Sequence, residues 1–533
     1  MRVLLLLLYL MLALYAGPAR ALDAATVEKL AFGESDEKVA AVRALTAQGD
    51  EQALTLLQAL ADGKIQTADK RVLIVDSDAG VDAVTGEKIS PLPEALDDVV
   101  VNNRLRGELD AALAALKLVS HDRTVRLAAA KALSSGADAA ILPLVHKALE
   151  HEGDPAIKPM LEMIAASIEA VSGDKSVRIA AIRTLGLSSA PNTETLLLGL
   201  LGKAPDGSYT EPDEDIRFEA QKSVRAVQGR LAWGERAGLL FAGVSLGSIL
   251  LLAALGLAIT YGLMGVINMA HGEFIMIGAY TTYVVQNFFH SHLAAWFGWY
   301  LVCAVPASFV VAALVGIALE RGVIRFLYGR PLETLLATWG ISLFLIQTVR
   351  TVFGAQNVEV ENPSWMSGGL EILSNVVLPY SRIVIILFAA FVLFLVWAMI
   401  ARTRIGLFVR AVTQNRPMAS CIGVRTPWVD MLAFGLGTGI AGLAGCALSQ
   451  IGNVGPELGQ SLIVDSFMVV VLGGVGQLAG TVYAGLGLGI LNKVLEGWSG
   501  AVLAKIAILV FIIFFIQKRP QGLFALKSRV TES

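Results

Sequence analysis

Two hydrophobic patterns divide the chain. Between residues 22 and 236, apolar residues recur at helical spacing among polar and charged ones, as in helices that bury one face. From residue 237 onward the apolar residues form long runs of the kind that cross membranes. The pattern predicts an all-α protein in which a helical domain precedes a polytopic membrane helix bundle, residues 237–533.

Nine apolar runs in the second half are candidate membrane spans. Most approach the roughly 20 residues that a helix needs to cross the hydrocarbon core. They lie at residues 238–261, 265–287, 298–319, 334–353, 382–401, 428–451, 462–478, 480–497 and 502–517. We therefore expect a bundle of about eight to ten spans.

A shorter apolar run opens the chain. It follows Arg2 and ends before Ala19-Arg20-Ala21, which fits the small-x-small pattern of a cleavage site. Residues 1–21 are therefore predicted to be a secretory signal peptide, and an uncleaved membrane anchor is the alternative. A signal peptide would place residues 22–236 in the periplasm.

A loose repeat runs through this exported half. The repeat appears as "DRTVRLAAAKAL" from Asp122, "DKSVRIAAIRTL" from Asp174 and "DEDIRFEAQKSV" from Asp213, with a degenerate copy, "DEKVAAVRAL", from Asp36. The intervals of 52 and 39 residues between the three clear copies bracket the roughly 40–47 of HEAT-type repeats. Asp at each start suits a helix N-cap. We expect a HEAT-like helical repeat domain with an inserted loop or hairpin at residues 62–103.

Charge adds an orientation. Residues 22–236 hold 24 Lys and Arg against 34 Asp and Glu, whereas residues 237–533 hold 16 against 11. Twelve of those 16 basic residues lie in the connectors after the third, fifth and last predicted spans. Basic connectors stay in the cytoplasm, and the acidic loop 354–381 then lies outside. An exported first half and nine spans give the same orientation, with a cytoplasmic C-terminus.

The stretch "GVINMAHGEFIMIGAY", residues 265–280, carries strongly polar residues inside an apolar tract. Charged side chains at membrane depth cost roughly 2.5–3.5 kcal/mol each on insertion scales. One hypothesis is a helix broken near Gly272 whose freed polar groups gate a pathway. The alternative is hydrogen bonding that braces the bundle interior. The candidate path or gate residues are Asn268, His271, Gly272, Glu273, Thr260 and Gln347.

The connector 402–427 is too polar to span a membrane. It reads "RTRIGLFVRAVTQNRPMASCIGVRTP" and contains short amphipathic stretches. A surface helix here would be a handle for a cytoplasmic partner, and a basic loop that only sets topology is the alternative. The chain has no G-x-x-x-x-G-K-[ST] motif for a nucleotide. We expect no catalytic residues, metal site, cofactor or nucleic-acid partner.

Several stretches identify the second half as a member of a known family. "YGLMGVINMAHGEFIMIGAY", "RAVTQNRPMASCIGV", "VVVLGGVGQLAGTVYAGLGLG" and "KRPQGLF" resemble ABC-transporter permeases of the branched-chain amino acid type. The resemblance covers about residues 237–526. It implies a subunit without enzymatic activity of its own, which works in a bacterial inner membrane with a second homologous permease, two ATPase subunits and a periplasmic substrate-binding protein. The connector would dock on the ATPase through Arg410, Ala411, Asn415, Met418, Ala419 and Gly423.

The same resemblance suggests a substrate. Within the family, the wording of "GLMGVINMAHGEFIMIGAYTTYVVQ" is similar to that of urea-transporter permeases, some of which carry an exported extension. Urea is small, neutral and polar, and the early spans offer uncharged hydroxyl and amide side chains. A permease for branched-chain amino acids is the main alternative. A passive solute channel and a membrane-anchored scaffold or sensor are two others.

Overall fold

The computed structural model describes residues 23–524 except 69–70, 77–78, 94–95, 135, 137, 204, 206, 266 and 374. The expected signal peptide, residues 1–21, lies outside the described residues. The chain forms two compact units, Met1–Leu231 and Ala232–Ser533, here called the N-terminal and C-terminal units. Helix α11 (Glu214–Met264) contributes residues to both. The boundary is near the predicted one at residues 236/237.

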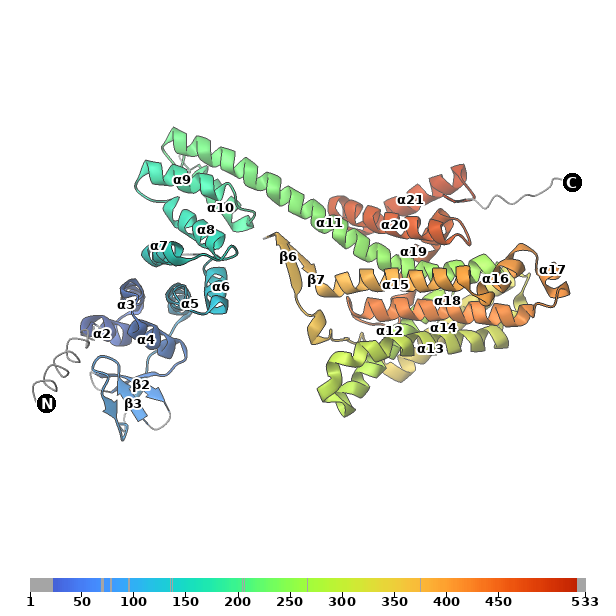
Figure 1. Ribbon diagram of the computed structural model, residues 1–533, viewed down its shortest axis with the longest axis horizontal. Helices are drawn as coiled ribbons and strands as arrows, with labels where there is room; N and C mark the ends of the chain where they lie inside the picture. The colour runs from blue at the N-terminus through green and yellow to red at the C-terminus, as the bar shows by residue number, and fades with distance from the viewer. Residues whose placement is uncertain are drawn as a thin grey trace, which may run out of the picture. The chain divides into compact units, whose positions relative to one another are not determined.

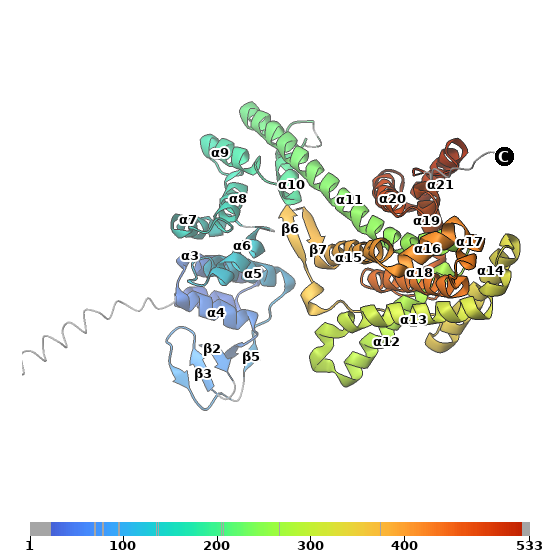
Figure 2. The same ribbon diagram turned by 45° about the vertical axis from the view of Figure 1, so that its right-hand side comes forward.

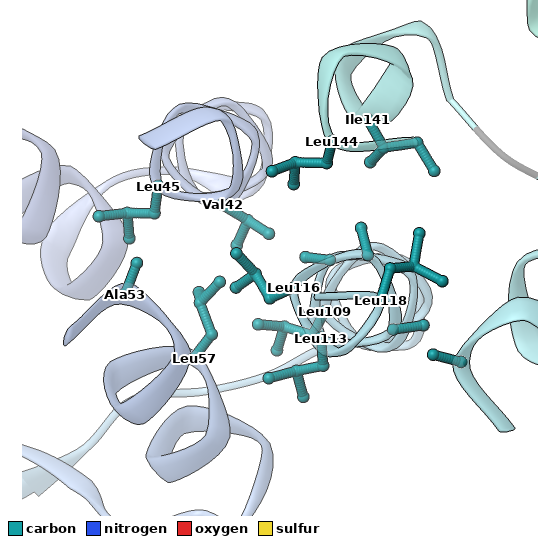
Figure 3. Close-up of a cluster of buried hydrophobic side chains, with 14 of the residues drawn as sticks. Val42, Leu45, Ala53, Leu57, Leu109, Leu113, Leu116, Leu118, Ile141 and Leu144 are labelled. Carbon is teal, nitrogen blue, oxygen red and sulfur yellow. The ribbon is translucent and has the colours of Figure 1, made fainter. Parts of the chain in front are cut away.

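Short helices that pack on their neighbours in the chain build most of the N-terminal unit. They are α2 (Ala24–Phe32), α3 (Ser35–Gln48), α4 (Glu51–Ala61), α5 (Asn103–Lys117), α6 (Arg123–Leu133), η1 (Ala139–Ile141), α7 (Leu142–His151), α8 (Lys158–Glu169), α9 (Lys175–Leu185) and α10 (Pro191–Leu200). The apolar faces of α2 to α8 meet in one buried cluster (Figure 3), where Leu45 of α3, Leu57 of α4 and Leu109 of α5 are almost fully buried. Helices α9 and α10 contribute to a second buried cluster together with the start of α11. The predicted helical periodicity is therefore confirmed in this unit.

The repeated Asp residues begin helices, as the sequence predicts. Asp122 accepts a hydrogen bond of 2.8 Å from the backbone N–H of Thr124 at the start of α6, and Asp174 caps α9 in the same way. The degenerate copy differs. Asp36 lies within the first turn of α3, and the capping box there is made by Glu34 and Glu37. A carboxylate side chain still caps this helix, but it lies two residues earlier than expected.

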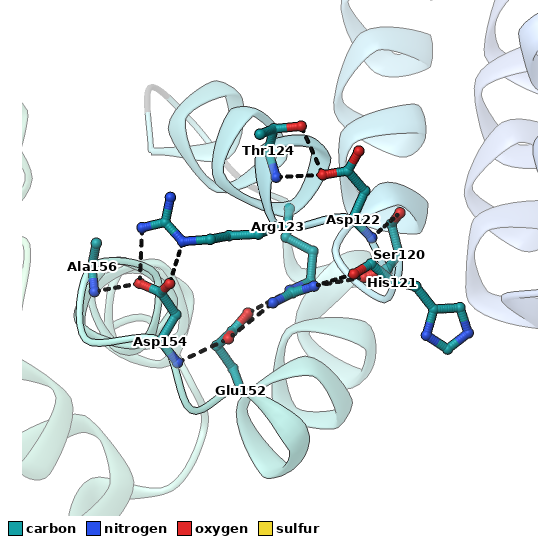
Figure 4. Close-up of polar contacts among 9 residues, drawn as sticks. Ser120, His121, Asp122, Arg123, Thr124, Glu152, Asp154 and Ala156 are labelled. Atoms are coloured by element: carbon teal, nitrogen blue, oxygen red, sulfur yellow. Dashed lines mark hydrogen bonds and ion pairs between the residues drawn. The ribbon is translucent and has the colours of Figure 1, made fainter.

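An arginine lies four residues after the capping Asp, and it connects the loop before its own helix to a loop farther along the chain. Arg126 contacts Glu152 at 2.8 Å and donates to the carbonyls of Ser120 and His121 (Figure 4). Arg178 makes the equivalent ion pair with Glu211. The hydrogen bond from Arg126 holds the pKa of the Glu152 carboxyl below its usual range. The Asp–Arg spacing thus marks two helix starts at which the arginine pairs with a glutamate farther along the chain.

Residues 62–103 contain more regular structure than a loop or hairpin. Strands β1 (Ile65–Ala68), β2 (Arg71–Asp76), β3 (Ala79–Asp82), β4 (Lys88–Ile89) and β5 (Asp97–Asp98) form an antiparallel sheet in the order β4-β3-β2-β1-β5. The segment Val72–Val75 alternates poorly but is rich in β-branched residues. The all-α expectation is therefore wrong for this insertion, although the chain is mostly helical.

The C-terminal unit is a bundle of long helices. After α11 they are α12 (His271–His292), η2 (Ala294–Trp299), α13 (Tyr300–Gly322), η3 (Ile324–Leu327), α14 (Pro331–Phe353), η4 (Ser364–Met366), α15 (Tyr380–Arg402), α16 (Arg404–Gln414), α17 (Arg416–Cys421), α18 (Thr426–Ser449), α19 (Leu458–Gly473), α20 (Leu478–Ser499) and α21 (Ala501–Lys518). A hairpin of β6 (Gly369–Leu373) and β7 (Val376–Pro379) leads into α15 (Figure 2).

Seven of the described helices are long and apolar enough to cross a membrane. They correspond to seven of the nine predicted spans. The remaining two predicted spans fall on α12, which is more polar, and on α19, which has only 16 residues. The structure thus has a helix at every predicted span, and α12 and α19 are the two that fall short in apolarity or length.

Glycines allow the central helices to touch. Figure 1 shows α12, α13 and α18 side by side, and these helices pack closely on one another. A Cβ atom added at Gly278 of α12 would lie 2.0 Å from the carbonyl oxygen of Gly442 in α18. A Cβ at Gly480 of α20 would likewise lie 1.9 Å from the carbonyl oxygen of Gly473 in α19. The glycines of α19 and α20 therefore allow these two helices to approach at the distance of backbone contact.

The connectors between the long helices contact one another in two separate groups. The connectors after α12, α14 and α18 meet one another, because Trp365 donates to the Gly298 carbonyl at 2.8 Å and Val358 bridges to Val454. The connectors after α13 and α15 also meet, where the Arg416 guanidinium lies 5.1 Å from the centre of the Tyr328 ring. The acidic loop belongs to the first group and two of the basic connectors belong to the second.

Candidate functional site

The polar stretch of residues 265–280 contains a break between two helices. Helix α11 ends at Met264, and α12 begins at His271. Gly265 has φ +64°, a left-handed conformation that ends helices and favours glycine. The predicted interruption therefore exists, and it lies just before Gly272 rather than at it.

Side chains satisfy backbone groups that the break leaves free. Asn268 is 1% exposed, and its Oδ1 accepts a hydrogen bond of 3.0 Å from the N–H of Ala270. Thr338 of α14 accepts a hydrogen bond of 3.2 Å from the N–H of Met269. Irregular backbone is tolerated at membrane depth only where such partners or a cavity are present. Asn268 and Thr338 thus hold the break in a defined conformation.

His271 and Glu273 point to two different neighbours from the first turn of α12. The Nε2 atom of His271 lies 3.0 Å from the carbonyl oxygen of Ala253 in α11, and Oε1 of Glu273 accepts a hydrogen bond of 2.8 Å from Ser342 of α14. Both side chains are at most 1% exposed. Each keeps one buried polar atom that has no partner among the described residues, His271 Nδ1 and Glu273 Oε2. Such atoms in a native interior call for an explanation, for which water or a passing ligand are candidates.

Gly272 lies between these two residues and touches a third helix. A Cβ atom at this position would lie 2.3 Å from the carbonyl oxygen of Gly459 in α19, and the converse distance is 2.2 Å. The break is therefore packed against α11, α14 and α19 at once. Any movement of α19 or α14 would therefore displace His271 and Glu273.

The structure brings together four of the six predicted path or gate residues: Asn268, His271, Gly272 and Glu273. Thr260 is buried on α11, where its hydroxyl donates to the Gly256 and Leu257 carbonyls of its own helix. Gln347 lies on an exposed face of α14, away from the break.

Ser342 was not predicted as a site residue. It is buried on α14 together with Thr334 and Thr338. The three residues recur at every fourth position, so they share one face of the helix. This spacing is the sequence signal that could have identified Ser342 as a partner of the polar break.

The predicted coupling connector folds into two short helices. The side chain of Thr403 caps α16, and Asn415 caps α17 by accepting a hydrogen bond of 3.0 Å from the N–H of Met418. Ala419 is buried beside Val412 of α16 and Val429 of α18. Arg410, Met418 and Gly423 are exposed, and Ala411 is half-buried. The connector therefore has a buried side that anchors it to the bundle and an opposite side that is exposed in the described part of the chain.

Two hollows adjoin this connector. A groove of about 380 Å³ is lined by Ile405, Phe408, Gly423, Val424, Arg425, Trp428, Val429 and Leu432. A larger cavity of about 1060 Å³ lies among α11, α13, α15, α16 and α18 and extends to residues 476–479. Its lining includes Arg410 and Gln414 from the connector and Ile259 from α11. The cavity therefore reaches from the connector to the helix that precedes the polar break.

Comparisons with known proteins concern the C-terminal unit. The family model described as "Branched-chain amino acid transport system / permease component" matches residues 239–516. The Escherichia coli K12 high-affinity branched-chain amino acid transport system permease protein LivH is 30% identical over 297 residues, which cover 53% of this chain and 94% of that protein. BraD of Pseudomonas aeruginosa is 29% identical, covering 53% and 93%, and a probable LivH of Methanocaldococcus jannaschii is 24% identical, covering 52% and 88%. No solved structure matches the chain.

Proposed function

The chain belongs to the family of branched-chain amino acid transport system permease components, and we propose that it is the membrane-spanning subunit of an ATP-driven importer that translocates urea. The observation that carries this proposal is the break between α11 and α12, where Asn268, His271 and Glu273 are buried inside the bundle. Interrupted helices with buried polar groups are typical of transport sites. The matched family region includes this break.

The energy for transport comes from partners in this proposal. ATP hydrolysis is supplied by two ATPase subunits, and a second homologous permease and a periplasmic substrate-binding protein complete the importer. The connector 402–427 docks on an ATPase through the exposed side of α16 and α17. Exposed apolar side chains there, including Met418, Ile422 and Leu407, suit a protein partner better than water.

The polar break acts as a gate or joint in this proposal. Three neighbouring groups, His271 Nδ1, Glu273 Oε2 and Asn268 Nδ2, are buried and have no partner in the part of the chain that the structure describes. Water or substrate can satisfy them when the bundle opens, so they stabilise an open state relative to the closed one. Of the two remaining candidates, Thr260 is buried on α11 and can extend the path there, whereas Gln347 lies on an exposed face of α14 and would join the path only if a partner covers that face.

The two groups of connectors support the proposed orientation. Trp296, Trp299 and Trp365 are exposed near the acidic loop, as expected for residues at a membrane interface. The opposite group carries the basic residues of the connectors after α13 and α15. We place the basic group and the C-terminus in the cytoplasm of a bacterium and residues 22–236 in the periplasm. There the helical repeat domain is suited to protein contact, with the substrate-binding protein as its partner.

Urea is favoured by the chemistry around the break. Asn268, Thr338 and Ser342 supply neutral donors and acceptors, which match the amino groups and carbonyl of urea. A branched-chain amino acid is the second candidate, because the named relatives transport branched-chain amino acids.

One experiment separates these substrates. The complete importer is reconstituted in proteoliposomes with its binding protein, and uptake of labelled urea and of labelled leucine is measured with ATP inside. Urea uptake that stops when the ATPase is inactivated supports the proposal. Leucine uptake without urea uptake would show that the substrate is a branched-chain amino acid and not urea. Uptake at full rate with an inactive ATPase would indicate a passive channel.

A further inference from the structure

A cluster of charged groups joins the short helix α17 to the bundle. Arg416, the first residue of α17, forms an ion pair with Asp430 of α18. The Asp430 side chain is 2% exposed, whereas that of Arg416 is 39% exposed. A buried carboxylate is costly without a partner, so Asp430 strongly favours a conformation in which Arg416 stays in place.

The same guanidinium also contacts an aromatic ring. Its carbon atom lies 5.1 Å from the centre of the Tyr328 ring, within the range of a cation–π interaction. The Tyr328 hydroxyl donates a hydrogen bond of 2.9 Å to Oε1 of Glu320, which is 1% exposed on α13. Arg416 therefore connects α17 directly to α18 and, through Tyr328, to α13.

The two helices that receive these contacts are tightly packed. A Cβ atom at Gly442 of α18 would lie 2.5 Å from the carbonyl oxygen of Ser308 in α13, and one at Gly445 would lie 1.8 Å from the carbonyl oxygen of Ile275 in α12. Helices in such close contact cannot slide past one another without a steric clash. A displacement of α18 is therefore transmitted to α12, which carries His271 and Glu273.

We propose that Arg416 is a positioning residue that transmits movement of the connector to α13 and α18. The proposal rests on the importer function proposed above. A partner that pulls on α17 moves Arg416, and the Asp430 and Tyr328–Glu320 contacts convert that pull into a movement of the bundle. Ordinary anchoring would need only the apolar contacts of Ala419 with Val412 and Val429. The charged cluster adds a directional connection that apolar contacts lack.

Arg416→Gln tests this proposal in the complete importer. We expect the ATPase subunits to co-purify and ATP hydrolysis to stay within twofold of wild type, while substrate imported per ATP hydrolysed falls at least tenfold. Arg416→Lys keeps the charge but loses the planar guanidinium, and we expect an intermediate ratio. Arg330→Gln is the control, because it breaks an exposed ion pair with Glu333 in the same unit and should leave the ratio unchanged.

A second variant distinguishes loss of the ion pair from misfolding of the subunit. The exchange of Arg416→Asp with Asp430→Arg restores an ion pair, and we expect it to recover at least a third of the wild-type ratio. An unchanged ratio in Arg416→Gln overturns the proposal. So does a loss of assembly in Arg416→Gln that the exchange does not repair. A wild-type importer that transports nothing would instead reject the importer function itself, so the two failures are distinguishable.

Discussion

Ser342 and Glu273 are linked by a hydrogen bond of 2.8 Å between the middle of α14 and the first turn of α12. The bond satisfies one carboxyl oxygen of Glu273, while the other, Oε2, has no partner within the described ranges of the chain. Glu273 is therefore held at one atom and free to bind at the other. This arrangement suits a residue that changes partner during transport.

Substitution of Glu273 should slow transport without preventing assembly. Glu273→Gln keeps the shape, but its amide nitrogen replaces one acceptor oxygen, and His271→Ala removes the contact with Ala253. Loss of one hydrogen bond costs about 1 kcal/mol, which corresponds to a roughly fivefold slower uptake. Uptake in proteoliposomes and co-purification of the partner subunits provide the measurements.

Thr348→Ala is the matched control for these variants. Thr348 is exposed on α14 and bonds only the backbone of its own helix at 2.8 Å. Its removal should leave uptake unchanged. Full uptake in both Glu273→Gln and His271→Ala would assign the polar break to packing alone.

Gly272→Ala should destabilise the C-terminal unit. The added Cβ would lie 2.3 Å from the carbonyl oxygen of Gly459, so α12 and α19 must separate. Overpacking of this kind costs about 1–3 kcal/mol. Thermal unfolding in detergent should show a lower midpoint for Gly272→Ala than for Gly340→Ala, since among the described residues no atom beyond the chain neighbours and the surrounding helix backbone lies within 4 Å of a Cβ added at Gly340. Equal midpoints would contradict the tight crossing of α12 and α19.

Asn415→Ala should unwind the start of α17. The Asn415 side chain accepts the N–H of Met418 at 3.0 Å, and removal of such an N-cap costs about 0.5–2 kcal/mol. Hydrogen exchange of the α17 amides should accelerate in the alanine variant. Asn415→Asp keeps an acceptor at the cap and should retain slow exchange, whereas equally fast exchange in both variants would show that the cap is dispensable.

The turn between α7 and α8 should loosen in acid. The Arg126 hydrogen bond lowers the pKa of Glu152 in the folded state from the ordinary value of 4.5. A lowered folded pKa gives stability that is fully present above the unfolded pKa and is lost as the pH falls through the folded pKa. The hydrogen-exchange protection factors of the segment around Glu152 in the full chain, each normalised to the intrinsic rate at that pH, should therefore be high near neutral pH and fall below about pH 4.5.

Arg126→Gln supplies the comparison for that titration. Without the guanidinium, the pKa of Glu152 moves toward its ordinary value, and the acid-dependent part of the protection should largely disappear. The same dependence in both proteins would place the acid-sensitive group elsewhere.

The sequence alone determined where the membrane helices of this protein lie, because hydrophobic period and run length are local properties. Every predicted span coincides with a helix, and Asp122 and Asp174 begin the helices expected of them. The polar stretch around His271 was also visible, because such residues are costly in an apolar run. The small sheet after α4 was missed, since its short strands are stabilised by pairing with one another rather than by a strong local pattern.

Tertiary structure decided which residues meet. Local sequence patterns do not predict the contacts that join one helix to another. Three examples are the pairs Ser342 with Glu273, Gly272 with Gly459, and Arg416 with Asp430. Gln347 is as polar as Ser342, yet the turn of α14 leaves it exposed. Sequence sets the cost of a polar residue in a membrane helix, whereas helix rotation and crossing decide which partner offsets that cost.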